Sequence, residues 1–143
     1  MNYEQIYKAI VKKHLKRGVE KNDGCVEKEI AKAEKGLGVR IPKAIREYYR
    51  IVGNNNDLNK YHNYFYDLKE LVIDDEYLLF MDENQCVVSW GIKVSDINDE
   101  NPEIWQRNNT EPVQWHSEEM AFTEFIQKMF EWVFNSKDLT EGV

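Results

Sequence analysis

The stretch Met81-Asp82-Glu83-Asn84-Gln85-Cys86-Val87-Val88-Ser89-Trp90-Gly91-Ile92 predicts two β-strands joined by a tight acidic turn. An apolar run, 77–81, enters the turn, and a β-branched and aromatic run, 86–92, leaves it. Apolar runs on either side of a polar turn are typical of a hairpin in an antiparallel sheet. More carboxylates follow at once, at Asp96, Asp99, Glu100 and Glu103, with Trp105 just beyond them. Aromatic and acidic side chains crowded onto strands and loops favour a recognition surface over a reaction centre.

Helical periodicity dominates the chain before this hairpin. Apolar residues at three- and four-residue steps predict a helix over 2–18 and a second that begins near Val26 and stops at Gly36 to Gly38. A third helix opens at Pro42, because the N–H that proline lacks would have no partner at the first helical position, and it ends at Gly53.

After the third helix, apolar residues recur at every second position, which is the spacing of a β-strand. Short strands are predicted over 64–68, 77–81, 86–92, 104–107 and 113–116. Residues 117–135 then follow the helical template most clearly, with Ser117 as the N-cap, and 136–143 is a tail. This order predicts an α+β fold as a single domain over 1–135. It has N-terminal helices, a central antiparallel sheet of about five short strands and a long C-terminal helix packed on the sheet.

Charge is distributed unevenly along the 143 residues, whose formal net charge is −7. Residues 1–50 carry 13 Lys+Arg against 7 Asp+Glu, whereas residues 51–143 carry 6 against 19. The acidic part repels nucleic acid and attracts a basic partner. The start of the chain is amphipathic and charged, and no apolar run approaches the roughly 18 residues of a membrane span, so a cytoplasmic protein without membrane contact is expected. The two cysteines, Cys25 and Cys86, are expected to be reduced thiols.

No pattern of catalytic or metal chemistry emerges. The three histidines lack the spacing of a metal site. The segment Asp96-x-Asn98-x-Glu100 begins like a calcium loop, but Asn101 stands at the required glycine and Arg107 at the closing glutamate. Nucleophile-elbow and phosphate-loop patterns are also missing from the sequence. We therefore expect no enzyme, no metal site and no cofactor.

Three short motifs occur in order along the chain. The first is Ile30-Ala31-Lys32-Ala33-Glu34-Lys35-Gly36-Leu37-Gly38-Val39-Arg40-Ile41-Pro42, the second is the helix over 43–49, and the third is the Asp82–Gln85 turn with the aromatic strand 90–92. Together they resemble the SUKH superfamily, which groups fungal cell-wall-assembly regulators of the SMI/KNR type with bacterial toxin-immunity proteins. The match spans roughly 26–135. The turn Asp99-Glu100-Asn101-Pro102 and the loop Asn54–Asn56 depart from the usual family pattern.

The resemblance implies an immunity protein that neutralises a cognate polymorphic or contact-dependent toxin, most often a nuclease. Carboxylates can occupy a basic nuclease cleft in place of phosphates, and their charge steers association. Expected partner-binding residues are Asp74, Asp75, Glu76, Asp82, Glu83, Asp96, Asp99, Glu100 and Glu103, with Trp90 or Trp105 as the anchor. Each of these indoles, and that of Trp115, can face either the core or the open side of the sheet.

Two other functions are compatible with the sequence. The fungal branch of the superfamily suggests a regulatory protein-binding scaffold with no toxin partner. An enzyme is disfavoured, because no nucleophile, base or metal constellation is evident. The chain is expected to be a monomer or weak homodimer, since an apolar strand such as 86–92 could pair with a second copy if it lay at a sheet edge.

Overall fold

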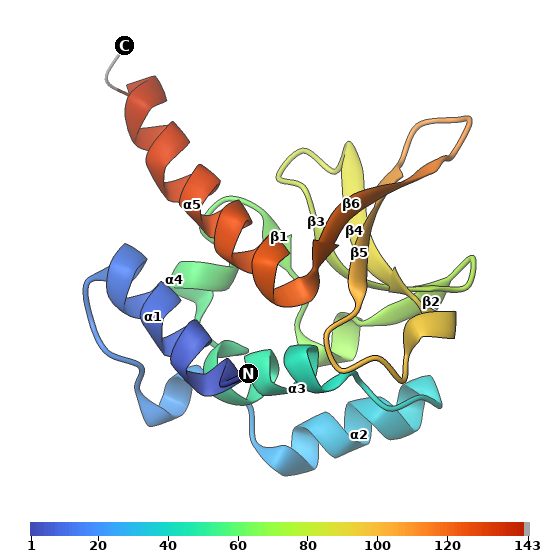
Figure 1. The fold of residues 1–143 in the computed structure, drawn as a ribbon, viewed down its shortest axis with the longest axis horizontal. Helices are drawn as coiled ribbons and strands as arrows, with labels where there is room; N and C mark the ends of the chain where they lie inside the picture. Colours follow the sequence, from blue (N-terminus) through green and yellow to red (C-terminus); the bar gives the residue numbers. More distant parts are fainter. Residues whose placement is uncertain (142–143) are drawn as a thin grey trace.

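The computed structural model describes residues 1–141, and it confirms the predicted α+β fold (Figure 1). The N-terminal helices are α1 (Tyr3–Leu15), α2 (Glu27–Leu37), α3 (Lys43–Val52) and α4 (Asn56–Asn59). The strands are β1 (Tyr64–Phe65), β2 (Val72–Asp74), β3 (Tyr77–Asp82), β4 (Val88–Lys93), β5 (Glu103–Asn108) and β6 (Trp115–Ala121), followed by α5 (Phe122–Glu141). Short 3-10 helices are η1 (Lys21–Asp23), η2 (Leu68–Glu70) and η3 (Val94–Asp96). Within residues 1–141, none of the helices has the length and apolar character needed to cross a membrane.

All strand pairs of the six-stranded sheet are antiparallel. The order is β1-β3-β4-β5-β6, and β2 also pairs with β3. Strand β4 therefore has a hydrogen-bonded neighbour on each side, β3 and β5. The expectation that the 86–92 segment could be a free edge for a second copy is wrong, because the backbone groups of β4 are already paired on both sides. Cys86 does not belong to the strand but lies in the preceding turn with φ 59°, and both cysteines are free thiols.

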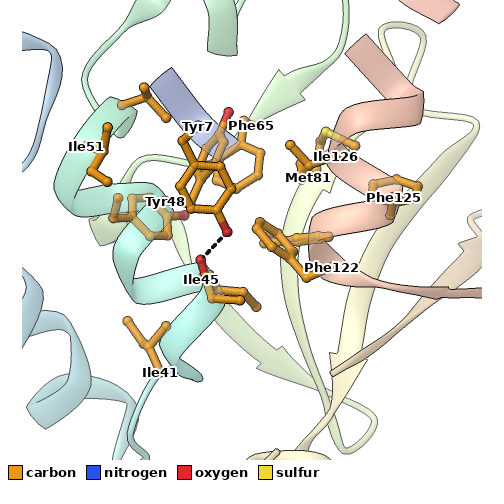
Figure 2. Packing of buried hydrophobic residues seen from close by; sticks show 14 of the residues in the cluster. Tyr7, Ile41, Ile45, Tyr48, Ile51, Phe65, Met81, Phe122, Phe125 and Ile126 are labelled. Carbon is orange, nitrogen blue, oxygen red and sulfur yellow. Dashed lines mark hydrogen bonds between the residues drawn. The ribbon is translucent and has the colours of Figure 1, made fainter. Parts of the chain in front are cut away.

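The core lies between α3, α5 and one face of the sheet, where aromatic rings interlock (Figure 2). The ring of Phe122 packs against Phe80 of β3 at 5.4 Å and against Tyr48 of α3 at 5.7 Å between centroids. Tyr48 is fully buried and donates its hydroxyl to Asn59 Oδ1 at 2.6 Å. The helical spacing of apolar residues in α3 and α5 predicts one apolar face on each helix. These two faces are the ones that pack in the core.

The second helix ends within the Gly36 to Gly38 segment, as predicted. Helix α2 includes Gly36 and stops at Gly38, which adopts φ +75° as the left-handed C-cap. The carboxylate of Glu34 then accepts the backbone N–H of Ile41 at 2.8 Å and contacts the Arg46 guanidinium at 3.3 Å. One acidic side chain thus joins the end of α2 to the start of α3.

The last helix begins and ends later than predicted. Ser117 is not its N-cap, because it pairs with Trp105 in the β5–β6 ladder and β6 continues to Ala121. Helix α5 instead begins at Phe122, whose N–H donates to the carbonyl of Pro102 at 2.9 Å. It runs past the predicted end at Asn135 as far as Glu141, so the predicted tail is helical up to that residue. Residues 142–143 lie outside the described part of the chain.

Candidate protein-binding surface

Side chains of a strand alternate between the two faces of its sheet. The position of Trp90 therefore shows which face of this sheet is turned toward α5. The Trp90 ring contacts Phe125 of α5 at 5.7 Å, so its neighbours on β4 point to the opposite side. Residues directly opposite each other in an antiparallel pair share a face. We call the side turned away from α5 the open face; it carries Tyr77, Leu79, Lys93, Trp105, Arg107 and Trp115.

An aromatic cluster occupies the middle of the open face. The ring of Tyr77 stacks on the indole of Trp115, with centroids 3.6 Å apart and planes 6° apart, and meets the edge of Trp105 at 6.1 Å. Gly91 pairs with Leu79 on one side and with Trp105 on the other. A Cβ at Gly91 would lie 2.6 Å from the backbone oxygen of Leu78, so the close approach of these strands requires glycine there.

Charged side chains surround the aromatic cluster and contact it directly. Arg107 pairs with Asp74 at 2.7 Å, and its guanidinium lies 5.7 Å from the centre of the Trp115 ring. The indole N–H of Trp115 donates to Asp75 Oδ2 at 3.1 Å. The carboxylates of the β2–β3 turn therefore help to hold the aromatic side chains of β6.

The β2–β3 turn is a two-residue loop in which Asp75 and Glu76 have φ values of 52° and 66°. Positive φ at both central positions is the pattern of a type I′ turn, which favours Asn, Asp or Gly at the first position and Gly at the second. A left-handed conformation costs a residue with a Cβ about 1–2 kcal/mol. Asp75 suits the first position, whereas Glu76 stands at the position that glycine usually fills, and both residues are exposed.

Three carboxylates act together on Tyr77. Burial raises the pKa of Tyr77 above 10.0, and the negative charges of Asp75, Asp96 and Glu76 raise it further. The segment that carries Asp96 is held beside the turn, because the N–H of Val94 donates to the carbonyl of Glu76 at 2.9 Å. The structure thus brings together acids that are about twenty residues apart in the sequence.

Other predicted contact residues lie in different places. The backbone carbonyl of Glu100 accepts the N–H of Ala44 at the start of α3, and the Glu100 carboxylate pairs with Lys43 at 3.7 Å. Asp99 is exposed on the same loop. Glu103 is half-buried at the start of β5 and accepts the hydroxyl of Ser117. These three acids lie at the same end of the sheet as the β2–β3 turn, although Asp99 and Glu100 face the helices.

Asp82 and Glu83 lie at the opposite end of β3 from the β2–β3 turn. Asp82 is half-buried and accepts the hydroxyls of Tyr66 and Ser89, each at 2.6 Å. The Glu83 carboxylate accepts two backbone N–H groups within its own turn, from Gln85 and Val87. The predicted acidic residues therefore do not form one continuous surface, and these two hold local structure together.

The tryptophans are also divided between the faces. Trp90 is only 8% exposed and donates its N–H to Glu118 at 2.8 Å on the core side. Trp105 is half-buried on the open face, and its N–H has no hydrogen-bond partner among the described residues. Trp132 of α5, which the sequence analysis did not single out, is 57% exposed and lies against His62.

The pattern of the SMI1 / KNR4 family (SUKH-1) matches residues 24–128. The chain belongs to this family. No curated protein matches the chain. The SMI1/KNR4 match covers α2, α3, the whole sheet and the first part of α5, so the open face lies entirely within the family domain.

The structure accounts for one unusual turn in this SMI1/KNR4 member. In the segment Asp99-Glu100-Asn101-Pro102, the amide of Asn101 donates to the Thr123 hydroxyl at 2.9 Å and accepts the Thr123 N–H at 3.1 Å. The asparagine thus satisfies an N–H group in the first turn of α5 that has no partner within the helix.

Sequence reasoning missed the open-face residues Tyr77, Lys93 and Arg107. The strand pattern placed Tyr77 in an apolar run but could not show which aromatic residue it would meet, because that depends on the pairing of four strands. Among residues 1–141, no group of three or more His, Cys, Asp or Glu side chains is arranged to hold a metal ion.

Proposed function

We propose that this chain is a non-catalytic immunity protein that binds and neutralises a cognate polymorphic or contact-dependent toxin in the cytoplasm. The toxin would be a nuclease whose basic cleft accepts carboxylates in place of phosphates. Membership of the SMI1/KNR4 family supports a protein-binding role. The binding surface would be the open face with the β2–β3 turn, and the chain itself would contact neither nucleic acid nor membrane.

The observation that carries this proposal is the acidic tip beside the aromatic cluster. Glu76 occupies a left-handed position where glycine would be more stable. Local strain of this kind is found where a residue serves something other than the fold. Next to the tip, Tyr77 and Trp115 supply the side-chain types that dominate binding energy at interfaces.

An interface of standard size buries about 800 Å² on each partner, roughly a tenth of the 8268 Å² that this chain exposes. In such an interface the carboxylates would accelerate encounter with a basic partner, whereas the aromatic rings would slow dissociation.

Co-expression tests the proposal directly. The C-terminal domain encoded by the adjacent reading frame is expressed in a bacterial host with and without this chain, and growth and co-purification are measured. We expect the domain alone to stop growth and the chain to restore it through a stable complex. A co-purifying protein without any toxicity would instead favour the regulatory scaffold.

A charge-reversal pair locates the interface. Among the described residues, no hydrogen bond or ion pair engages the carboxylates of Glu76 and Asp96, so Glu76→Lys with Asp96→Lys should leave the fold intact. The matched control, Glu29→Lys with Asp57→Lys, changes two exposed acids of the helical layer by the same total charge. We expect the first pair to weaken the complex at least tenfold more than the control, and equal effects would place the interface elsewhere.

A further inference from the structure

Strand β6 forms one edge of the sheet, because β5 is its only hydrogen-bonded neighbour strand among the described residues. At the other edge β1 and β2 are only two and three residues long, and such short strands protect an edge from pairing with another chain. Strand β6 has seven residues and contains neither lysine nor proline, which commonly protect an edge. A free strand of this length can accept a further strand from a partner.

The backbone groups of Trp115 and Ser117 point outward from this edge. The N–H of Asn108 at the end of β5 donates to the carbonyl of Gln114 at 2.9 Å, which marks a hydrogen-bonded pair. Bonded and non-bonded pairs alternate along an antiparallel ladder, so His116 is bonded to β5, whereas Trp115 and Ser117 are not. Within residues 1–141, no hydrogen bond outside the β5–β6 ladder engages the backbone groups of Trp115 or Ser117.

Charge favours a basic strand as the occupant of this edge. Residues 108–127, which include β6, carry four glutamates and no lysine or arginine. On the open face beside the edge, the indole N–H of Trp115 donates to the Asp75 carboxylate at 3.1 Å. A second copy of the chain would bring the same acidic edge against this one, and like charges on facing strands are destabilising. A strand that carries arginine or lysine meets opposite charges instead.

We propose that the partner adds a basic β-strand to β6 and so extends the sheet, with its cationic side chains on the open face. This inference rests on the proposed function, because it states how the basic partner is held. Residues directly opposite each other in an antiparallel pair share a face. The partner residues that exchange backbone hydrogen bonds with Trp115 and Ser117 are therefore the ones whose side chains join the open face.

A cationic side chain opposite Trp115 lies close to both the indole ring and Asp75, so cation–π attraction and opposite charge act on it together. The β5–β6 ladder shifts register before its far end, and Glu119 has a φ of 57°. A bulge of this kind interrupts regular pairing, so the added strand pairs with the stretch of β6 before Glu119.

The test uses the intact chain and the peptide acetyl-Thr-Arg-Thr-Arg-Thr-amide. One derivative carries N-methyl groups on both arginines, and the other carries them on the second and third threonines. NMR follows the backbone N–H signals of Trp115 and Ser117, and we expect the unmodified peptide to shift both signals and to slow their exchange with solvent. Methylated arginines should weaken binding about tenfold, because two donors to β6 are lost, whereas methylated threonines should change it less than about twofold.

Two controls separate charge from backbone pairing. The peptide acetyl-Thr-Glu-Thr-Glu-Thr-amide has the same length and the opposite charge, and it should bind at least about tenfold more weakly. Ser117→Pro removes one outward N–H of the edge, where proline is tolerated, and should weaken binding of the arginine peptide about tenfold. The methylated peptides test the same hydrogen bonds on the wild-type chain, should thermal denaturation show that Ser117→Pro is unfolded.

Four results would overturn the inference. They are no shift of either amide signal by the arginine peptide, equal binding of the two methylated derivatives, equal binding of the glutamate peptide, and signals of Trp115 and Ser117 that move with protein concentration when no peptide is present. The last result would show that a second copy occupies the edge. The co-expression experiment does not depend on these signals, so a failure of strand pairing is distinguishable from a wrong toxin assignment.

Discussion

The ring of Tyr77 on β3 lies flat against the indole of Trp115 on β6, with 3.6 Å between the centroids, although β4 and β5 lie between these strands in the sheet order. This stack links the β2–β3 turn to the β5–β6 hairpin, and a hydrogen bond from Trp115 to Asp75 adds to that link. The stack therefore joins the two ends of the open face.

The first prediction concerns this stack. Tyr77→Ala and Trp115→Ala should be coupled in a double-mutant cycle by about 0.5–1.5 kcal/mol of unfolding free energy, because each substitution removes the same ring contact. Chemical denaturation of the four proteins measures the coupling. Trp132→Ala, at an exposed position on α5, should show no coupling with Tyr77→Ala. Strictly additive effects of Tyr77→Ala and Trp115→Ala would show that the stack contributes nothing to stability.

The second prediction concerns the strained turn. Glu76→Gly should raise the unfolding free energy by about 1 kcal/mol, because glycine adopts φ +66° without a steric penalty. The same change should weaken the complex with the partner, because it removes an exposed carboxylate from the tip. Thermal denaturation and a binding titration on one preparation measure both effects. Glu76→Gln, which keeps the Cβ, should weaken binding without gaining stability, and this separates the two causes.

The third prediction contrasts two glycines. A Cβ added at Gly36 would meet nothing within 4 Å, so Gly36→Ala should stabilise α2 by about 0.5–1 kcal/mol. A Cβ at Gly53 would lie 2.6 Å from both Cys25 Sγ and the carbonyl oxygen of Tyr49, so Gly53→Ala should destabilise the fold by about 1–3 kcal/mol. Urea denaturation measures both. Destabilisation by Gly36→Ala would contradict the open surroundings of that residue.

The fourth prediction concerns pH. The His14 side chain is only 6% exposed, stacks on Phe134 at 4.8 Å and lies 3.8 Å from Glu131. Burial lowers the pKa of His14 from 6.5, the nearby Glu131 carboxylate opposes this shift, and Lys13 and Lys16 add to it. The folded protein therefore binds this proton less readily than the unfolded chain. The stability that neutral His14 gives to the folded protein is complete above pH 6.5. It is lost as the pH falls from that value through the lower pKa of His14 in the folded protein.

His14→Phe should accordingly flatten the loss of unfolding free energy between pH 7 and pH 5, as measured by denaturation at several pH values. Glu131→Gln should lower the pKa of His14 further, because it removes the only carboxylate that raises it among the named charges. NMR titration of the His14 ring protons checks the direction. A His14 pKa above 6.5 in the wild-type protein would contradict the dominance of burial.

Elements with a strong local pattern were predictable from the sequence. Phe122, Phe125 and Ile126 recur at helical spacing, and all three are buried where α5 meets the sheet. The acidic turn after Met81 separates β3 from β4 as predicted. Boundaries without such a pattern were not predictable: β6 extends through Ser117 because its backbone pairs with β5, and no local signal reveals a partner strand.

The sequence by itself determined the α+β order of elements, the family and the acidic character of residues 51–143, because periodicity, motif spacing and charge are properties of the chain. Only the tertiary structure decided which of those acids act together. In the folded protein Asp75, Glu76 and Asp96 lie around Tyr77, whereas Asp82 lies at the far end of β3 and Trp90 lies in the core. The reason is that strand register and sheet curvature arise from hydrogen bonds and ring contacts between residues far apart in the chain, and a one-residue change of register moves a side chain to the other face.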